Sequence, residues 1–202
     1  HSAEARENQS VVLAFPVKNI KKLHPNSAFK LLQNLLPLIS ENFAHASNII
    51  LTLKHIGSLI GLYARVEEMG TEILKTLLEP VFASRAIIVL KEADGRTGKI
   101  RAVVGFANNS ILHKTIFIDD DFIFNQVIKK NELVNIREAD YMIGKKKNPY
   151  IEKSVLAAPL SIGNYTIGAI ALIDKKKDGG FTANNEILLS IVAQMISFGI
   201  NN

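Results

Sequence analysis

Apolar residues in the second half of the chain recur with a period of two, which predicts a β-sheet. Ala86–Lys91 and Lys99–Ala107 are predicted strands, and Ala93-Asp94-Gly95 between them has turn chemistry. Leu133–Ile136 predicts a brief third strand, and the charged, aperiodic stretch Arg137–Tyr150 predicts a long loop. The sequence therefore predicts several strands that lie close together in the chain.

The next two predicted strands flank Gly163-Asn164, a strong signal for a hairpin turn. Both faces of the second strand are apolar, which predicts a sheet that is covered on both sides. The pattern places Tyr165, Ile167, Ala169, Ala171 and Ile173 on one face, and Ile170 with Leu172 on the other.

Apolar residues at helical spacing predict helices before and after these strands. One stripe follows Gly70-Thr71, and a wide stripe follows Thr182 at the end of the chain. Asp119-Asp120-Asp121 precedes a short apolar helix, whose positive end favours acidic residues. The two long stripes are Ile73, Leu74, Leu77, Leu78 and Val81, and Ile187, Leu188, Ile191, Val192, Met195 and Ile196.

The first part of the chain has a different pattern. We expect a strand over Gln9–Phe15, a helix from Pro16, and a further helix that is capped by Asn26-Ser27 and interrupted or kinked at Pro37. Residues 46–68 predict a connecting helix with about two heptads of apolar seam, formed by Ile49, Leu53, Ile56, Ile60 and Tyr63. Such a seam either packs on its own domain or mediates self-association.

Composition limits the classes of function. With 202 residues, 48% of them hydrophobic, the chain can bury one solid core plus an appendage. It has no cysteine, which excludes disulfides, zinc-thiolate sites, thiol nucleophiles and a thioether-linked bilin. No apolar run approaches the roughly 18 residues of a membrane span, and no signal peptide opens the chain, so we expect a cytoplasmic protein. The start at His1 suggests a fragment or a processed chain.

The net charge of +5 and the pI near 9.3 raise the question of nucleic-acid binding. However, Lys145-Lys146-Lys147 and Lys175-Lys176-Lys177 both fall in predicted loops without interleaved aromatic residues. We therefore interpret them as solvated loop surface, and nucleic acid is the weaker alternative.

No residue pattern indicates a catalytic centre. His24, His45, His55 and His113 are far apart and lack the close spacing of metal ligands. The three aspartates at 119–121 could hold a metal, but helix capping explains them better. We expect no enzymatic activity, no cofactor and no metal.

In its residue types and their spacing, the stretch 154–186 resembles the C-terminal half of a GAF domain, the small-molecule-sensing module of signalling proteins. Its end approximates the Asn-Lys…Phe-xxx-Asp-Glu signature of GAF domains that bind cyclic nucleotides. The chain has Asp174-Lys175 and Phe181-xxx-Asn185-Glu186 instead, so the acid that pairs with the lysine in those relatives is replaced by Asn185. The resemblance implies an α+β fold in residues 70–202. A central antiparallel sheet would carry helices on one face and a loop-covered pocket on the other, after an extended helical segment.

The same resemblance implies the walls of the pocket. An aromatic residue would stack on a purine base while Asn135 or Asp140 hydrogen-bonds its edge. The implied ligand-binding residues are Phe106, Ile118, Phe122, Asn135, Asp140, Tyr141, Tyr150 and Ser154.

Residues 1–45 resemble the end of a cyclic-nucleotide-binding regulatory domain, whose Arg-Ser/Thr-Ala triplet would align with His1-Ser2-Ala3. An ordinary strand-helix-helix extension is the alternative. With a connecting helix over 46–69 and a GAF domain over 70–202, the chain is predicted to be a regulatory sensor module. It would bind a small molecule, with a cyclic nucleotide as one candidate, and act as a homodimer on an effector domain outside this chain. The alternative is a ligand-free dimerisation domain.

Overall fold

The computed structural model describes residues 25–60, 62–63, 65–137, 150, 153–176 and 180–201. Within the chain, residues 1–47 and 48–202 form two separate compact units. The first unit contributes, among its described residues, the beginning of the helix α2 (Pro25–Ile60), which runs without interruption through Pro37. The interruption predicted at Pro37 is therefore wrong, and the alternative, a kink there, stays a prediction. The strand predicted at Gln9–Phe15 and the helix predicted from Pro16 lie outside the described residues.

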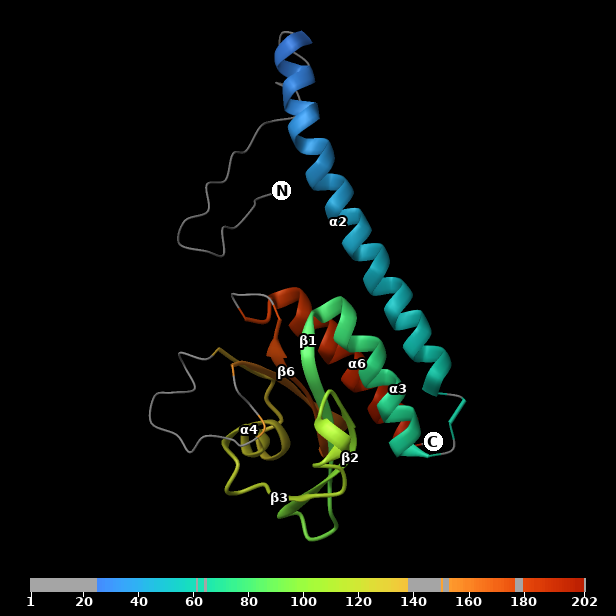
Figure 1. The fold of residues 1–202 in the computed structure, drawn as a ribbon, viewed down its shortest axis with the longest axis vertical. Coiled ribbons are helices and arrows are strands. Elements are labelled where there is room, and N and C mark those ends of the chain that lie inside the picture. Colours follow the sequence, from blue (N-terminus) through green and yellow to red (C-terminus); the bar gives the residue numbers. More distant parts are fainter. Residues whose placement is uncertain are drawn as a thin grey trace. The chain divides into compact units, whose positions relative to one another are not determined.

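The second unit is built on an antiparallel sheet of six strands (Figure 1). Its strand order is β3-β2-β1-β6-β5-β4, so the two longest strands lie near the centre. The strands are β1 (Ala83–Lys91), β2 (Thr97–Val104), β3 (Thr115–Phe117), β4 (Val134–Ile136), β5 (Val155–Ile162) and β6 (Tyr165–Lys175).

The predicted hairpin is confirmed, because β5 and β6 pair directly, with Ile162 opposite Tyr165. The predicted alternation along β6 holds from Ala169 to Ile173 but not at Ile167, which packs with Ile170 and Leu172 on the other face. The register of the β5–β6 pair shifts between Leu160 and Ser161, and such an irregularity changes the face of the residues beyond it.

Two long helices cover one face of the sheet, which we name the helix face (Figure 1). They are α3 (Val66–Val81) and α6 (Ala183–Asn201). The stripe predicted for α3 packs on the sheet, whereas the stripe predicted for α6 does so only in part, because Ile187 and Ile191 are exposed. Gly70 allows close approach, since a Cβ there would lie 3.0 Å from both Ala102 Cβ and Ile88 Cδ1. The order of helix, antiparallel sheet and closing helix confirms the predicted α+β class.

The seam predicted in the connecting helix packs within this unit. Ile56 is fully buried in the helix-face core, and Ile49, Leu53 and Ile60 are half-buried against it. A Cβ at Gly199 of α6 would lie 2.5 Å from Ile60 Cγ2, so the two helices are in close contact there. Of the two interpretations of this seam, packing on its own domain therefore has direct support.

Among the described residues, α6 is the one helix that is long and apolar enough to cross a membrane. The structure gives another reason for its composition. Leu188, Leu189, Val192, Ala193 and Ile196 are all buried in the helix-face core. The helix is apolar because one side of it packs on the sheet.

The opposite face, which we name the loop face, is covered by short and irregular segments. These are the single turn α4 (Phe122–Phe124) and a π-helix, η2 (Asn125–Lys129), together with Tyr150 from the segment before β5. A short 3-10 turn, η1 (Ala107–Asn109), follows β2. The strand β3 is not among the strands predicted from the sequence; its three residues, Thr115–Phe117, are flanked by no marked apolar run.

Candidate functional site

The loop face is where the sequence places a pocket, and it is closely packed in this structure. A small cavity of about 10 Å³ remains, which is room for about one water molecule. Ligand pockets for small molecules usually measure roughly 300–1,000 Å³. The cavity is apolar and is lined by Ile87, Ile123, Phe124, Tyr150, Val155, Ala171 and Ile173.

Four of the predicted binding residues lie on this face. Ile118 is fully buried in the loop-face core, and Phe106, Phe122 and Tyr150 are half-buried against the same core. The structure therefore brings together residues that are up to 44 positions apart, from Phe106 to Tyr150. Their contact with a ligand stays a prediction. Asp140 and Tyr141 lie outside the described residues.

Asn135 lies on the other face of the sheet, so its predicted place in the pocket is corrected. In β4, Val134 and Ile136 pack on the loop-face core, and the residue between them points the opposite way. The Asn135 amide donates to the backbone oxygen of Phe181 at 3.0 Å and to Glu186 Oε1 at 2.7 Å. Its amide therefore ties β4 to the start of α6. Its buried Oδ1 has no hydrogen-bond partner among the described residues.

Ser154 does not line the cavity either. It is buried just before β5, where its backbone N–H donates to Asp174 Oδ1 at 3.2 Å. Its Oγ accepts from the backbone N–H of Lys175 at 3.0 Å. Ser154 thus belongs to a polar junction at the end of β6, next to the loop face.

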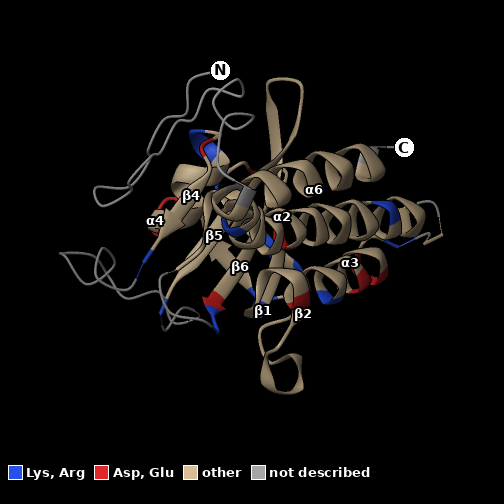
Figure 2. Cartoon of the chain, turned by 90° about the horizontal axis from the view of Figure 1, so that it is seen from above, with Lys and Arg blue, Asp and Glu red and all other residues tan. Residues whose placement is uncertain are grey.

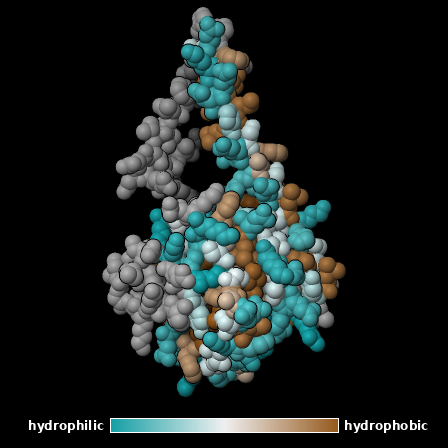
Figure 3. Space-filling model, in the orientation of Figure 1, coloured by the Kyte–Doolittle hydropathy of each residue, from teal (hydrophilic) through white to brown (hydrophobic). Residues whose placement is uncertain are grey.

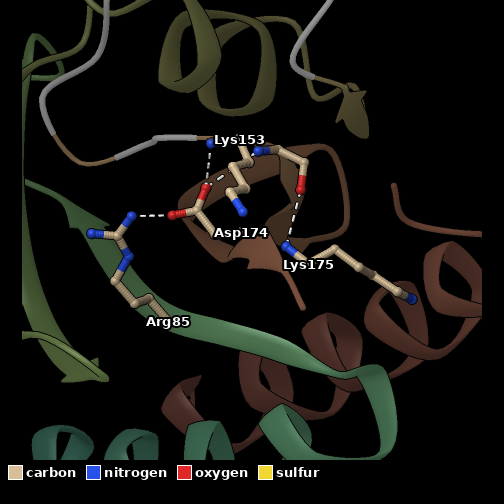
Figure 4. Close-up of polar contacts among 5 residues, drawn as sticks. Arg85, Lys153, Asp174 and Lys175 are labelled. Atoms are coloured by element: carbon tan, nitrogen blue, oxygen red, sulfur yellow. Dashed lines mark hydrogen bonds and ion pairs between the residues drawn. The ribbon is translucent and has the colours of Figure 1, made fainter. Parts of the chain in front are cut away.

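Asp174 is the centre of this junction (Figure 4). Its carboxylate accepts from the backbone N–H of Lys153 at 2.6 Å and pairs with the Arg85 guanidinium from β1. Both side chains of the ion pair are largely buried. Burial alone would raise the pKa of Asp174, but the hydrogen bonds from Arg85, Lys153 and Ser154 outweigh it and hold the pKa below its usual value.

Arg85 has a second contact. Its guanidinium lies over the ring of Phe106, 5.2 Å from the centroid. The sequence contains a signal for this residue, since Arg85 is a charged side chain directly before the apolar run of the strand, Ala86 to Leu90. The sequence pattern does not predict its partner, because Asp174 lies 89 residues further along the chain.

Lys175 makes the contact that the signature predicts, although its acidic partner is absent. Lys175 Nζ donates to Asn185 Oδ1 at 2.5 Å and lies 5.4 Å from the centre of the Phe181 ring. Asn185 Oδ1 also accepts from Thr182 N at 3.1 Å. The amide oxygen thus keeps the hydrogen bond between β6 and α6 but makes no ion pair.

Of the three aspartates at 119–121, Asp121 caps the short helix, as the capping interpretation predicts. Asp121 Oδ1 accepts from the backbone N–H groups of Ile123 and Phe124, at 3.0 and 3.1 Å. Burial raises the pKa of Asp121 despite these hydrogen bonds. Asp119 pairs with Lys129. The described segments contain no cluster of three or more potential metal ligands.

A larger groove of about 490 Å³ lies elsewhere in the same unit, between α6 and the edge of the sheet at β5. Asn131 stands at this groove in the left-handed conformation, with φ of 57°, and accepts from Ser161 Oγ at 2.7 Å. None of its described lining residues is charged. The lining residues are Asn131, Leu133, Ala158, Pro159, Ser161, Gly163, Ser190 and Gln194.

The weaker alternative, a nucleic-acid site, would need a surface of one charge. In the view of Figure 2, lysine, arginine, aspartate and glutamate are interspersed. Lys175, from one of the two lysine runs, is held against Asn185 and Phe181. The run Lys145-Lys146-Lys147 lies outside the described residues.

Comparison with known proteins agrees with the fold. No family model matches the sequence, and no curated protein matches it. The GAF domain of a phosphoenolpyruvate-protein phosphotransferase from Coxiella burnetii matches 77% of this chain and 94% of its own, with a TM-score of 0.68 and 16% identity. Residues 122 to 287 of a methyl-accepting chemotaxis protein match 72% and 94%, with a TM-score of 0.64 and 17% identity.

One similar structure is an enzyme. The type II free methionine-R-sulfoxide reductase from Thermoplasma acidophilum matches 71% of this chain and 95% of its own, with a TM-score of 0.56 and 19% identity. Identities this low establish the fold alone. The chain therefore has a GAF fold, as its sequence predicts, and its function has to be argued from its own residues.

Proposed function

We propose that this chain is a regulatory module of a signal-transduction protein. The module binds a small molecule on the loop face, and the conformational change on binding is passed to its flanking helices. The observation that carries the proposal is the difference between the two covers of the sheet. In the part of the chain that the structure describes, long regular helices pack on one face, whereas one helical turn, a π-helix and Tyr150 pack on the other, around a residual cavity. Short irregular segments can rearrange at lower cost than packed helices.

The lining of the cavity favours a particular ligand class. Seven described residues line the cavity; six of them have purely hydrocarbon side chains, and the seventh is Tyr150. A cyclic nucleotide needs a cation or several N–H donors for its phosphate. The nearby Arg85 is already paired with Asp174. We therefore rank an apolar or aromatic small molecule ahead of a cyclic nucleotide.

Ligand-induced thermal stabilisation tests this proposal, using a panel of aromatic metabolites together with cAMP and cGMP. Ala171 of β6 lines the cavity, so Ala171→Val should fill it and weaken binding at least about tenfold. Ala157→Val is the matched control, because Ala157 lies opposite Ala171 on β5 but does not line the cavity. If no member of the panel stabilises the protein, or if both variants bind as the wild type does, the loop face is not the ligand site.

A second candidate function, ligand-free dimerisation, has an observation of its own in α2. Large apolar side chains follow one another at alternating spacings of three and four residues and are exposed on the helix surface (Figure 3). This spacing is typical of a coiled-coil seam. Pro37 follows directly after a seam position and so falls outside the seam. The seam residues are Phe29, Leu32, Leu36, Ile39 and Phe43, exposed by 62%, 59%, 65%, 61% and 74%.

We infer that a homodimer would form through this seam, with exposed Ile187 and Phe198 of α6 as a further apolar surface. Light scattering at micromolar concentration should then give twice the chain mass. Leu36→Glu with Phe43→Glu should produce monomers, whereas Gln33→Glu with Asn34→Glu, between the seam positions, should not. A wild-type monomer would contradict the dimer. The effector domain, and a cyclic-nucleotide-binding domain before residue 46, remain proposals that the full-length protein would test.

A further inference from the structure

Asp174 and Lys175 end β6, and their side chains make contacts on opposite sides of the sheet. In a regular strand, residues two apart point to the same face. Ile173 packs in the loop-face core, whereas Lys175 reaches Asn185 and Phe181 on the helix side. The left-handed conformation of Asp174, with φ of 56°, breaks the alternation between them.

On the loop side, the carboxylate of Asp174 fixes two other segments. It holds the chain that enters β5, through the N–H groups of Lys153 and Ser154, and it holds Arg85 of β1. Arg85 in turn lies over Phe106, which packs on the loop-face core. A rearrangement of the loop face would therefore reach Asp174 through both the backbone before β5 and the Arg85 side chain.

On the helix side, Lys175 fixes the first turn of α6. Its ammonium group donates to Asn185 Oδ1, the same oxygen that accepts from the backbone N–H of Thr182. Asn185 is itself 94% buried, with 6% of its surface exposed. Figure 4 shows the Lys175 side chain extending away from Arg85, toward the helices.

We propose that the Asp174–Lys175 step is a mechanical connection between the loop face and helix α6. Asp174 and Lys175 are positioning residues in this connection, and the backbone turn between them transmits displacement from one side of the sheet to the other. The inference rests on the proposed function in one respect, that a ligand acts on the loop face. The connection itself is a property of the free protein and can be tested without a ligand.

A double-mutant cycle between Arg85 and Asn185 tests the connection. These residues lie on opposite sides of β6 and 100 positions apart, and independent distant sites have additive effects on stability. Arg85→Met removes the ion pair and keeps an unbranched side chain at this position; Asn185→Ala removes the acceptor of Lys175. Urea unfolding gives the equilibrium constant of unfolding for each variant. For independent sites, the double variant would change this constant by the product of the two single changes; we expect its change to be at least about threefold smaller than that product. If the two effects multiply to within threefold, the proposal is overturned.

The control cycle pairs Asn185→Ala with Asp94→Asn. Asp94 also accepts two backbone N–H bonds, from Arg96 and Thr97, but it lies in the turn between β1 and β2. Its effect should multiply with that of Asn185→Ala. If Arg85→Met does not fold, Asp174→Asn replaces it, because asparagine tolerates the left-handed conformation and keeps one acceptor oxygen.

Amide hydrogen exchange gives an independent readout. Asp174→Asn should speed exchange in the first turns of α6, at Leu188 and Leu189, as well as at the directly contacted Lys153 and Ser154. Faster exchange at Lys153 and Ser154 alone would overturn the connection. A failed ligand screen together with coupled stability would refute the proposed function alone, and a bound ligand with uncoupled stability would refute the connection alone.

Discussion

The two faces of the sheet differ in how they are held. On the helix face, α3 and α6 bury regular apolar stripes, and Ile73, Leu74 and Leu77 of α3 are completely inaccessible to solvent. On the loop face, small side chains such as Ala157 and Ala171 meet short segments whose ends are fixed by polar contacts of Asp121 and Asp174. The comparison indicates a rigid platform on one side and an adaptable cover on the other.

The difference has a physical basis in cooperativity. A long helix that packs along its whole length opens cooperatively, so its displacement breaks many contacts at once. Displacement of a single helical turn breaks few contacts. The short segments on the loop face can therefore rearrange without unfolding the helices on the helix face. Three comparisons of matched variants can break or sharpen this distinction.

The largest effect is expected from truncation of isoleucine on the two faces. Ile73 of α3 is fully buried and Ile123 of α4 is 1% exposed, but Ile123 borders the residual cavity. Isoleucine-to-alanine changes in cores cost about 2–5 kcal/mol, and less where the surroundings can collapse. We expect Ile73→Ala to lose about 4 kcal/mol of unfolding free energy and Ile123→Ala about 2–3 kcal/mol, measured by urea denaturation. Equal losses, or a larger loss at Ile123, would contradict an adaptable loop face.

A smaller effect is expected from enlarging a glycine under α3. Gly70→Leu would push α3 off the sheet, because even a Cβ there lies 3.0 Å from Ala102 Cβ. Overpacking of this kind costs about 1–3 kcal/mol. The control is Gly57→Ala in α2, where a Cβ meets Met195 Cε at an ordinary 3.4 Å and helix propensity should add about 0.5–1 kcal/mol. Thermal unfolding separates the two, and a stabilised Gly70→Leu protein would show that the helix face is not tightly packed.

The distinction between the two faces also explains which parts of the structure can be predicted from the sequence. The stripes of α3 and α6 and the hairpin at Gly163-Asn164 follow from residue periods and turn chemistry, so the fold and the helix face could be predicted. Such periods depend only on neighbours in the chain. They also survive local irregularities such as the register shift that displaced Ile167.

The candidate site could be predicted only in part. Phe106, Ile118, Phe122 and Tyr150 do share the loop face, but Asn135 points to α6 because the face of a residue in a three-residue strand depends on its pairing register. The continuation of α2 through Pro37 was also missed, since an isolated proline signals a break that a long helix can absorb. The Arg85–Asp174 pair joins distant segments, and no local pattern encodes it.

The smallest effect concerns two aspartates whose pKa values shift in opposite directions. Burial raises the pKa of Asp121, so its ionised form is disfavoured in the folded protein. Its contribution to stability is then greatest below the unfolded pKa and declines as the pH rises through the folded pKa. Asp174 has a lowered pKa, so its contribution is present above the unfolded pKa and declines as the pH falls through the folded pKa.

Asparagine caps helices about as well as aspartate, so Asp121→Asn should lie within about 0.5 kcal/mol of the wild type at low pH. Relative to the wild type, it should become more stable as the pH rises from about 3 to 7, because the variant no longer buries a charge. Asp174→Asn should become relatively less stable over the same range, because only the wild type gains the Arg85 ion pair. Urea unfolding at a series of pH values measures both trends. If both variants shifted in the same direction, the environments of the two carboxylates would not differ as the structure indicates. In the structure, backbone N–H groups hold the carboxylate of Asp121 against the effect of burial, whereas an ion pair holds that of Asp174.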